Sequence, residues 1–215
     1  MSESGFVFRL SVLLFYVLFY VLYVMKKVSG IIKTVRLRTI PLSVSGVLLG
    51  IMLAAADYEI NWLAAVFTVL TASFLQMVSN VSNELGDALS GTDTSERKGP
   101  KYPMQQGLLT VGDAKVLIWC LAALSVASGL AMIWFSFGTL LCLEAFMLMI
   151  LGAAAIFAAM RYTLGPSPYG YKGLGDIYVF VFFGLVSVLG GYFIVSHTLY
   201  WRILLPAVAI GAFST

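Results

Sequence analysis

Seven long runs of apolar residues, separated by short polar stretches, make up most of this 215-residue sequence. A helix needs about 20 mostly apolar residues to cross the hydrocarbon core of a bilayer. The runs cover approximately residues 6–25, 40–56, 61–82, 116–137, 139–160, 175–196 and 199–215. Six of them are long enough to span, and the seventh is still apolar where the sequence ends. The pattern predicts an all-α protein, a polytopic transmembrane helical bundle.

Lysine and arginine are concentrated in every second connection between these runs. Cytoplasmic loops of membrane proteins carry an excess of Lys and Arg, so this bias orients the chain. The connections around residues 57–61, 134–138 and 196–200 contain none and are interpreted as outer turns. Eleven of the 13 basic residues lie on the opposite side: Lys26, Lys27, Lys33, Arg36, Arg38, Arg97, Lys98, Lys101, Lys115, Arg161 and Lys172. We therefore predict a multi-pass protein of the cell inner (plasma) membrane whose site loops face the cytoplasm.

The composition agrees with lipid as the main solvent. Hydrophobic residues make up 60% of the sequence and charged residues 11%, against about 45–50% and about 25% in soluble domains. The net charge is +3, but the basic residues lie between apolar runs instead of forming an exposed stripe, so no nucleic-acid partner is expected. Cys120 and Cys142 lie within apolar runs, and neither a disulfide framework nor a zinc site is indicated.

The first run is rich in aromatic residues and ends at Met25, followed by two lysines. Because no small-residue cleavage site follows the apolar stretch, the run is not a good signal peptide. Met25 is a plausible alternative start for a membrane protein. We interpret residues 1–25 as an N-terminal extension without a required function, and residues 26–215 as part of a single transmembrane domain.

The third run ends in a polar sequence between residues 80 and 93. If its helix continues to Asp87, side chains with oxygen atoms recur at helical spacing on one face that looks into the bundle. These are Asn80, Asn83 or Glu84, and Asp87. Gly91 would then let the chain turn so that Asp93 comes back toward the same point. The sequence thus predicts a cluster of oxygen donors at the membrane boundary.

Such a cluster fits magnesium, a hard cation that takes one or two carboxylates and fills its other positions with water and phosphate oxygens. A capped helix end followed by a solvated charged loop is the simpler alternative. Three cations follow the cluster within a few residues, namely Arg97, Lys98 and Lys101. Because carboxylates for a metal stand beside cations for an anion, a magnesium-diphosphate site is favoured.

A second cytoplasmic loop, residues 161–176, contains glycines and prolines that give it a defined shape. Its tyrosines could belong to the aromatic belt of a membrane protein, and its Arg161 and Lys172 could be topology signals. Neither reading accounts for Asp176, an acid directly before a long apolar run. No catalytic Ser/His/Asp arrangement, nucleotide-binding P-loop or dinucleotide fingerprint occurs in the sequence.

Three motifs, in order, resemble those of the UbiA-like intramembrane prenyltransferases. They are RLRTIPLS at residues 36–43, NxxNELGDxxxGTD at residues 80–93 followed by RKGP, and YxxGPxPxxYxGLGD at residues 162–176 running into FVFFG. The resemblance is strongest to the branch that prenylates 1,4-dihydroxy-2-naphthoate in menaquinone biosynthesis. It covers approximately residues 32–215.

The resemblance implies a helical bundle around a lipid-open cavity, in which a polyprenyl diphosphate ionises and 1,4-dihydroxy-2-naphthoate attacks the cation with loss of carbon dioxide. Magnesium (Mg²⁺) would be held by Asn83, Asp87 and Asp93. Asp87, Asp93 and Lys172 would act in catalysis. Substrates would contact Asn80, Arg97, Lys101, Tyr162, Tyr171 and Asp176.

The family has about nine helices and a second Asp-rich motif, whereas this sequence ends within the sixth core helix. From the resemblance we expect the chain to be the N-terminal portion of the fold and inactive alone. Two alternatives stay open. The acceptor could be another aromatic ring, such as 4-hydroxybenzoate, or the chain could be a membrane transporter or scaffold, because intramembrane acids also mark ion pathways.

Overall fold

The computed structural model describes residues 3–91 and 102–215, and every regular element in these ranges is a helix. The longer helices are α1 (Glu3–Val35), α2 (Ile40–Ala54), α3 (Trp62–Ser90), α4 (Val111–Phe137), α5 (Leu143–Arg161), α7 (Ser187–Ser196) and α8 (Leu204–Ser214). The short ones are α6 (Gly175–Val179), a π-helix (Phe180–Val186) and 3₁₀ turns at Leu37–Thr39, Gly170–Lys172 and Trp201–Ile203. The prediction of an all-helical protein is confirmed.

Five helical stretches in the described ranges are long and apolar enough to cross a membrane. They are Leu18–Ala54, Trp62–Ser90, Val111–Phe137, Leu143–Arg161 and Gly175–Ser196, and a shorter apolar helical segment covers Trp201–Ser214. The sequence predicted six runs of spanning length. The difference lies at the N-terminus, where the first two runs form one apolar stretch without a loop between them.

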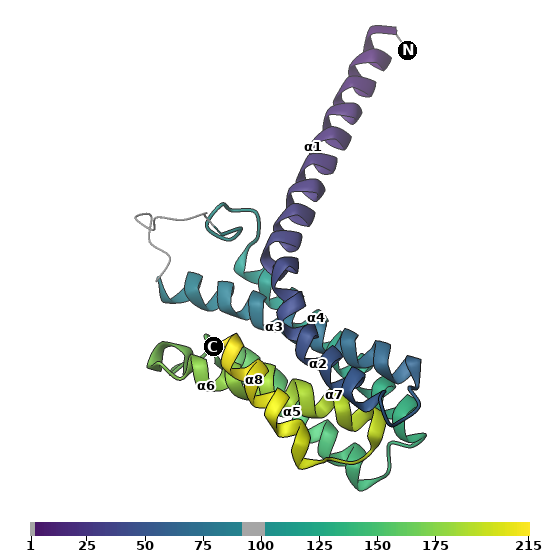
Figure 1. The fold of residues 1–215 in the computed structure, drawn as a ribbon. Coiled ribbons are helices and arrows are strands. Elements are labelled where there is room, and N and C mark those ends of the chain that lie inside the picture. Colours follow the sequence, from purple (N-terminus) through teal and green to yellow (C-terminus); the bar gives the residue numbers. More distant parts are fainter. Residues whose placement is uncertain (1–2, 92–101) are drawn as a thin grey trace.

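The joint between α1 and α2 is an elbow at Arg36, which adopts a left-handed backbone conformation with φ 51°. The basic residues from Lys26 to Lys33 therefore lie on a continuing helix, not in a connecting loop. In Figure 1, α1 extends away from the other helices, which lie together. Its described side chains from Leu18 to Met25 are apolar and exposed. This part of the chain therefore contributes no fully buried side chain to the bundle.

Helix α3 continues eight residues beyond the predicted end of the third apolar run, to Ser90. The Asn61 side chain caps its start by accepting hydrogen bonds from the backbone N–H groups of Leu63 and Ala64. Gly91, with φ 69°, ends it in the left-handed conformation that glycine adopts without strain. The condition set by the sequence, a helix that reaches Asp87, is met.

Close packing of the bundle depends on small residues. Helices α2 and α7 approach so closely that a Cβ atom on Gly50 would lie 2.1 Å from the carbonyl oxygen of Val188. A Cβ on Gly191 would lie 2.4 Å from the carbonyl oxygen of Val47. Such contacts let membrane helices gain van der Waals attraction along their backbones. They fix the two helices that form one side of the cavity described below.

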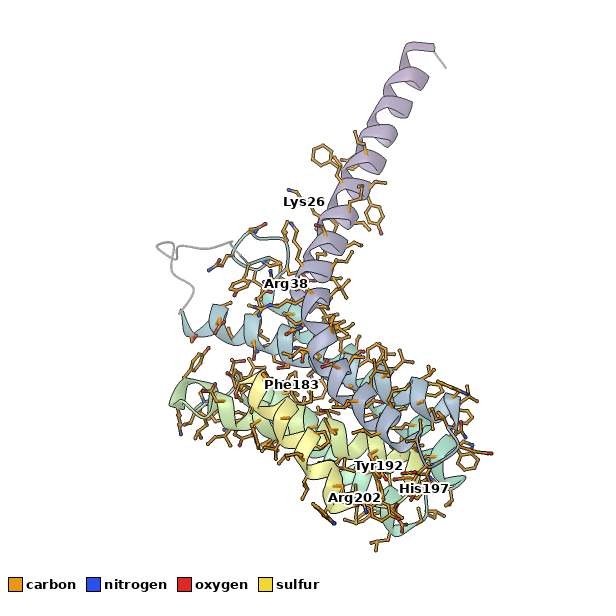
Figure 2. All side chains as sticks on the ribbon, viewed as in Figure 1. Lys26, Arg38, Phe183, Tyr192, His197 and Arg202 are labelled. Atoms are coloured by element: carbon orange, nitrogen blue, oxygen red, sulfur yellow. The ribbon has the colours of Figure 1, made fainter. Side chains whose placement is uncertain are left out.

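The two ends of the bundle differ in charge. Figure 2 shows Lys26 and Arg38 near the elbow, and His197 and Arg202 at the far end, beyond Phe183. The last turn of α3 and the 162–174 loop lie at the elbow end, since Asn80 bonds to the elbow and Tyr171 to Asp87. The last turn of α3 and the 162–174 loop therefore share one end of the bundle, as the charge pattern predicts.

Candidate active site

A cavity of about 360 Å³ opens between α2, α3, α5 and the continuous span formed by α6, the π-helix and α7. Most of its wall is apolar: Val47, Ala72, Leu75, Met132, Leu148, Leu151, Ala155, Ala158, Ala159, Val179, Phe182, Phe183, Val186 and Ile194. A wall of this kind suits an aliphatic chain and keeps water away from a reacting carbon.

The polar part of the wall comes chiefly from one stripe along α3. Gln76, Ser79, Asn80 and Asn83 all line the cavity. Their spacing of three or four residues places them one above another on the same helical face. Asp87, one turn beyond Asn83, continues the stripe toward the end of the helix and is half-buried. The stripe thus leads from the apolar interior to the polar end of the bundle.

Asn80 joins this stripe to the elbow between α1 and α2. Its Nδ2 atom donates to the carbonyl oxygen of Val35 at 2.8 Å and to Oγ1 of Thr39 at 2.9 Å. Its Oδ1 atom accepts from Nε2 of Gln76 at 3.1 Å. Asn80 is only 4% exposed. The Asn80 amide therefore stabilises the bend at the elbow, and Asn80 also forms part of the cavity wall.

Asp87, near the end of α3, contacts the 162–174 loop. The hydroxyl of Tyr171 donates to Oδ1 of Asp87 at 2.7 Å. One turn back, Oγ1 of Thr163 donates to Oδ1 of Asn83 at 3.3 Å. The 162–174 loop thus contacts both oxygen donors on α3 through hydroxyl groups. These contacts hold the predicted metal ligands at the polar end of the cavity, with Asn83 in its lining and Asp87 one turn beyond it. We call this end the mouth of the cavity.

The Glu84 side chain has a different hydrogen-bond partner from that of Asn83. It is fully buried, and its Oε1 atom accepts from the backbone N–H of Met104 at 2.9 Å. The segment that begins at Tyr102 is also held by Arg36, whose guanidinium lies 4.7 Å from the Tyr102 ring centre. Of the two residues left open by the sequence, Asn83 therefore faces the cavity, and Glu84 fixes the 102–109 segment.

Stacked aromatic rings form the wall on the side of the 162–174 loop and α6. The rings of Tyr169 and Tyr178 stack with centres 3.8 Å apart, and Phe182 continues the stack 6.2 Å from Tyr178. Tyr162 meets Tyr169 edge to face. Burial raises the pKa of the Tyr169 hydroxyl, which donates to the carbonyl oxygen of Ala158.

Comparison with known proteins identifies this arrangement. Residues 43–215 match the UbiA prenyltransferase family. The chain belongs to this family. It is accordingly a multi-pass membrane protein, and the resemblance inferred from its three motifs is confirmed. No solved structure gives a significant match.

Three curated relatives of the chain share one name. The chain is 39% identical over 184 residues to the 1,4-dihydroxy-2-naphthoate octaprenyltransferase of Escherichia coli (strain K12), covering 86% of the chain and 59% of the relative. It is 39% identical over 181 residues to the enzyme of the same name from Haemophilus influenzae, covering 83% and 58%. The Mycobacterium tuberculosis relative, also of that name, is 35% identical over 179 residues. The chain spans about three fifths of the length of these relatives.

The structure distributes the predicted site residues of this family member into three groups. Asn80, Asn83 and Tyr162 line the cavity. Asp87 and Tyr171 meet at its mouth, and Lys172 and Asp176 are exposed on the same loop and at the start of α6. Three further predicted residues, Asp93, Arg97 and Lys101, lie outside the described residues.

The described part of the chain contains two of the three predicted magnesium ligands, Asn83 and Asp87. In residues 3–91 and 102–215 no three His, Cys, Asp or Glu side chains cluster closely enough to hold a metal. Asn83 and Asp87 present an amide oxygen and a carboxylate one turn apart, and a cation with few protein ligands takes such donors. The donor chemistry fits magnesium, with substrate oxygens and water completing the shell.

Sequence reasoning missed four residues of this site. Gln76, Tyr169 and Tyr178 line the cavity, and Thr163 bonds to α3. Tyr178 and Phe182 are four residues apart, a spacing that could have indicated a shared aromatic face. Thr163 carried no such signal, because its partners lie about 80 residues away in the sequence.

Proposed function

We propose that this chain provides the diphosphate-binding half of an enzyme that transfers a polyprenyl group to 1,4-dihydroxy-2-naphthoate, a step of menaquinone biosynthesis. One observation supports this most directly. The hydrogen bond from Tyr171 to Asp87 joins the second and third family motifs at the mouth of an apolar cavity. The names of the relatives supply the acceptor, and family membership favours an enzyme over a transporter or scaffold.

The mouth of the cavity would hold the polyprenyl diphosphate by its charged end. Asn83 and Asp87, with Asp93, would hold magnesium, which neutralises charge on the departing diphosphate. Arg97, Lys101 and Lys172 would donate hydrogen bonds to the diphosphate oxygens. Tyr171 would keep the Asp87 carboxylate in position through its hydroxyl. Such fixed groups stabilise the leaving group without having to reorganise as the bond breaks.

The apolar wall would then protect the reacting carbon. The bond between the allylic carbon and the diphosphate oxygen breaks, and the electron pair leaves with the oxygen. A ring carbon of the naphthoate forms the new bond, and the bond to the carboxylate carbon breaks to release carbon dioxide. Tyr162 and the stacked Tyr169 and Tyr178 line the cavity. Ring faces attract cations and stack on aromatic acceptors, so this wall would hold both reactants close.

The site would face the cytoplasm at the inner membrane, because the basic connections mark that side. Among acceptors, 4-hydroxybenzoate is the alternative to the naphthoate. The prolines at positions 166 and 168, before Tyr171, match the naphthoate motif. Lipid surrounds the bundle and gives a long polyprenyl tail a place outside the cavity. Asp176 and Asn80 would contact the substrates at the edges of the site.

The test uses the chain and a chimera in which residues 1–215 are followed by whatever part of the Escherichia coli relative lies beyond the matched region. Both are placed in lipid nanodiscs with Mg²⁺, farnesyl diphosphate and either acceptor, and products are identified by mass. We expect the chimera to prenylate the naphthoate at least tenfold faster than 4-hydroxybenzoate, and the chain alone to be inactive. EDTA should abolish the reaction.

Two variants of the chimera locate the site. Asp87→Asn should lower the rate at least a hundredfold, because it removes a carboxylate beside the diphosphate. Asp57→Asn is the matched control, a carboxylate in a turn outside the cavity at the other end of α3. A folded chimera that prenylates neither acceptor would contradict the proposed function. Full activity of the Asp87 variant would contradict the metal site.

A further inference from the structure

Thr163 connects the 162–174 loop to the turn of α3 that carries Asn83. It is 6% exposed, and its Oγ1 atom donates to the carbonyl oxygen of Ser82 at 2.8 Å. The same atom lies 3.3 Å from Oδ1 of Asn83 and donates to it. A Cβ atom on Gly86 would lie 2.4 Å from the Cβ of Thr163. The loop can reach α3 at this point only because residue 86 has no side chain.

The two acceptors compete for a single proton. A threonine hydroxyl carries one hydrogen and two lone pairs, so it donates fully to one partner and can accept from others. The contact to Ser82 is 0.5 Å shorter than the contact to Asn83 and lies in the normal range for a hydroxyl donor. Asn83 therefore receives the weaker share of this proton. The two ends of the Asn83 amide, the NH₂ donor and the carbonyl acceptor, have nearly the same shape.

We propose that Thr163 is a positioning residue that turns the Asn83 amide toward a bound cation. When a cation occupies the mouth, the amide rotates half a turn about its last side-chain bond. Nδ2 of Asn83 then donates to Oγ1 of Thr163, the hydroxyl proton stays on the Ser82 carbonyl, and Oδ1 faces the metal. In this arrangement the Thr163 hydroxyl, the Ser82 carbonyl and the Asn83 amide oxygen each have a partner. The inference rests on the proposed function, because it requires a metal at Asn83 and Asp87.

The 162–174 loop also contacts the second predicted metal ligand, Asp87. Tyr171 donates to Asp87, one turn along α3 from Asn83. Outer partners of this kind fix the orientation of metal ligands, and their loss commonly weakens metal binding about 10–100-fold. The loop would therefore set the geometry of both ligands without touching the metal itself. The loop comes this close to α3 at Thr163 because Gly86 has no side chain.

The test measures binding of Mn²⁺ alone, as a paramagnetic substitute for Mg²⁺, by electron paramagnetic resonance on the 215-residue chain in nanodiscs. Thr163→Val, which keeps the shape and removes the hydroxyl, should weaken binding about tenfold. Thr163→Ser, which keeps the hydroxyl, should bind within about twofold of the original chain. Thr34→Val is the matched control: Thr34 is fully buried, and its hydroxyl bonds to no residue in the described ranges. It should leave binding unchanged.

A double-mutant cycle separates positioning from general packing. If Thr163 acts through Asn83, Thr163→Val should have no further effect on Mn²⁺ affinity in an Asn83→Ala background. Additive losses, or a Thr163→Val variant that binds as tightly as the original chain, would overturn the inference and leave the proposed function intact. If the original chain shows no Mn²⁺ binding that depends on Asp87, both the inference and the proposed function are overturned. If the valine variant fails to fold, Thr163→Cys gives the same comparison, because a thiol is a weak donor and acceptor.

Discussion

The Tyr171 hydroxyl and the Asp87 carboxylate lie 2.7 Å apart although 84 positions separate them in the sequence. One comes from a loop rich in glycine and proline, and the other from the last turns of a long apolar helix. The contact forms because α3 continues past its apolar run and because Gly86 lets the loop approach it. The chemistry proposed for this protein depends on that meeting point.

Removing the hydroxyl of Tyr171 should reduce activity without unfolding the protein. Tyr171→Phe deletes a hydrogen bond to a carboxylate, and such bonds contribute about 1.5–3 kcal/mol when shielded from water. Tyr171 is 46% exposed, so the effect should lie at the low end. We expect kcat/KM of the chimera to fall about tenfold and the Mg²⁺ concentration at half-maximal rate to rise.

The control for this variant is Tyr200→Phe, since Tyr200 accepts a hydrogen bond from Tyr58 at the opposite end of the bundle. It loses a tyrosine hydroxyl of similar exposure outside the site. Its kcat/KM should stay within about twofold of the original value. If both variants lost activity equally, the Tyr171–Asp87 bond would have no specific role in the reaction.

Asn80 should matter for stability more than for substrate binding. Asn80→Ala leaves the Val35 carbonyl without its side-chain donor, and the Gln76 amide keeps its longer contact to Thr39 at 3.3 Å. A buried polar group left unsatisfied costs about 1–3 kcal/mol. Thermal unfolding in nanodiscs should therefore shift down by several degrees. Ser45→Ala, which removes an exposed hydroxyl on α2, should leave the unfolding temperature unchanged.

The Asn80 variant also separates two roles. If the amide mainly stabilises the elbow, the affinity of the chain for a prenyl diphosphate should fall less than threefold at a temperature where the variant is folded. A loss of affinity of tenfold or more with normal thermal stability would favour direct substrate contact, the role that the family resemblance implies.

The apolar spans could be predicted because the hydrocarbon thickness sets their length. The runs at 116–137, 139–160 and 175–196 agree with α4, α5 and the Gly175–Ser196 span to within five residues at each end. The elbow could not be predicted. Basic residues between two apolar runs are typical of a loop, and only the left-handed Arg36 and its neighbours held by Asn80 make the chain turn sharply there.

The candidate site could be predicted in part because the period of a helix, like the length of a membrane span, can be recognised in the sequence. Helical periodicity placed Asn83 and Asp87 on one face, and the structure confirms that α3 reaches them. Periodicity could not decide between Asn83 and Glu84, which are adjacent in the sequence. Contacts from distant segments decide it, since Met104 binds Glu84 and Thr163 binds Asn83. Contacts of that kind leave no trace in local spacing.

Two adjacent glycines in α7 should respond oppositely to alanine. In Gly191→Ala the new methyl group would lie 2.4 Å from the Val47 carbonyl oxygen, so α2 and α7 would have to separate. We expect a loss of at least 2 kcal/mol, on the order of other overpacked sites. Gly190→Ala meets no atom within 4 Å and should be neutral or slightly stabilising, because alanine favours a helix more than glycine does. Thermal unfolding of both variants in nanodiscs checks this, and equal shifts would contradict the close approach of the two helices.

The N-terminal extension should be dispensable up to Met25. Its described side chains from Leu18 to Met25 are exposed, whereas Lys27 forms an ion pair of 2.5 Å with Asp113 at the start of α4. A chain that begins at Met25 keeps this pair, and we expect normal membrane integration and, in the chimera, normal activity.

A chain that begins at Val28 loses the Lys27–Asp113 pair and is the informative comparison. It should still insert, because the remaining spans are intact, but it should unfold at a lower temperature than the chain that begins at Met25. Both side chains of the pair are partly exposed to solvent, so the difference should be small. Membrane fractionation and thermal unfolding measure the two effects. Loss of membrane integration on trimming to Met25 would show that the first apolar run is needed for insertion, contrary to its interpretation as an extension.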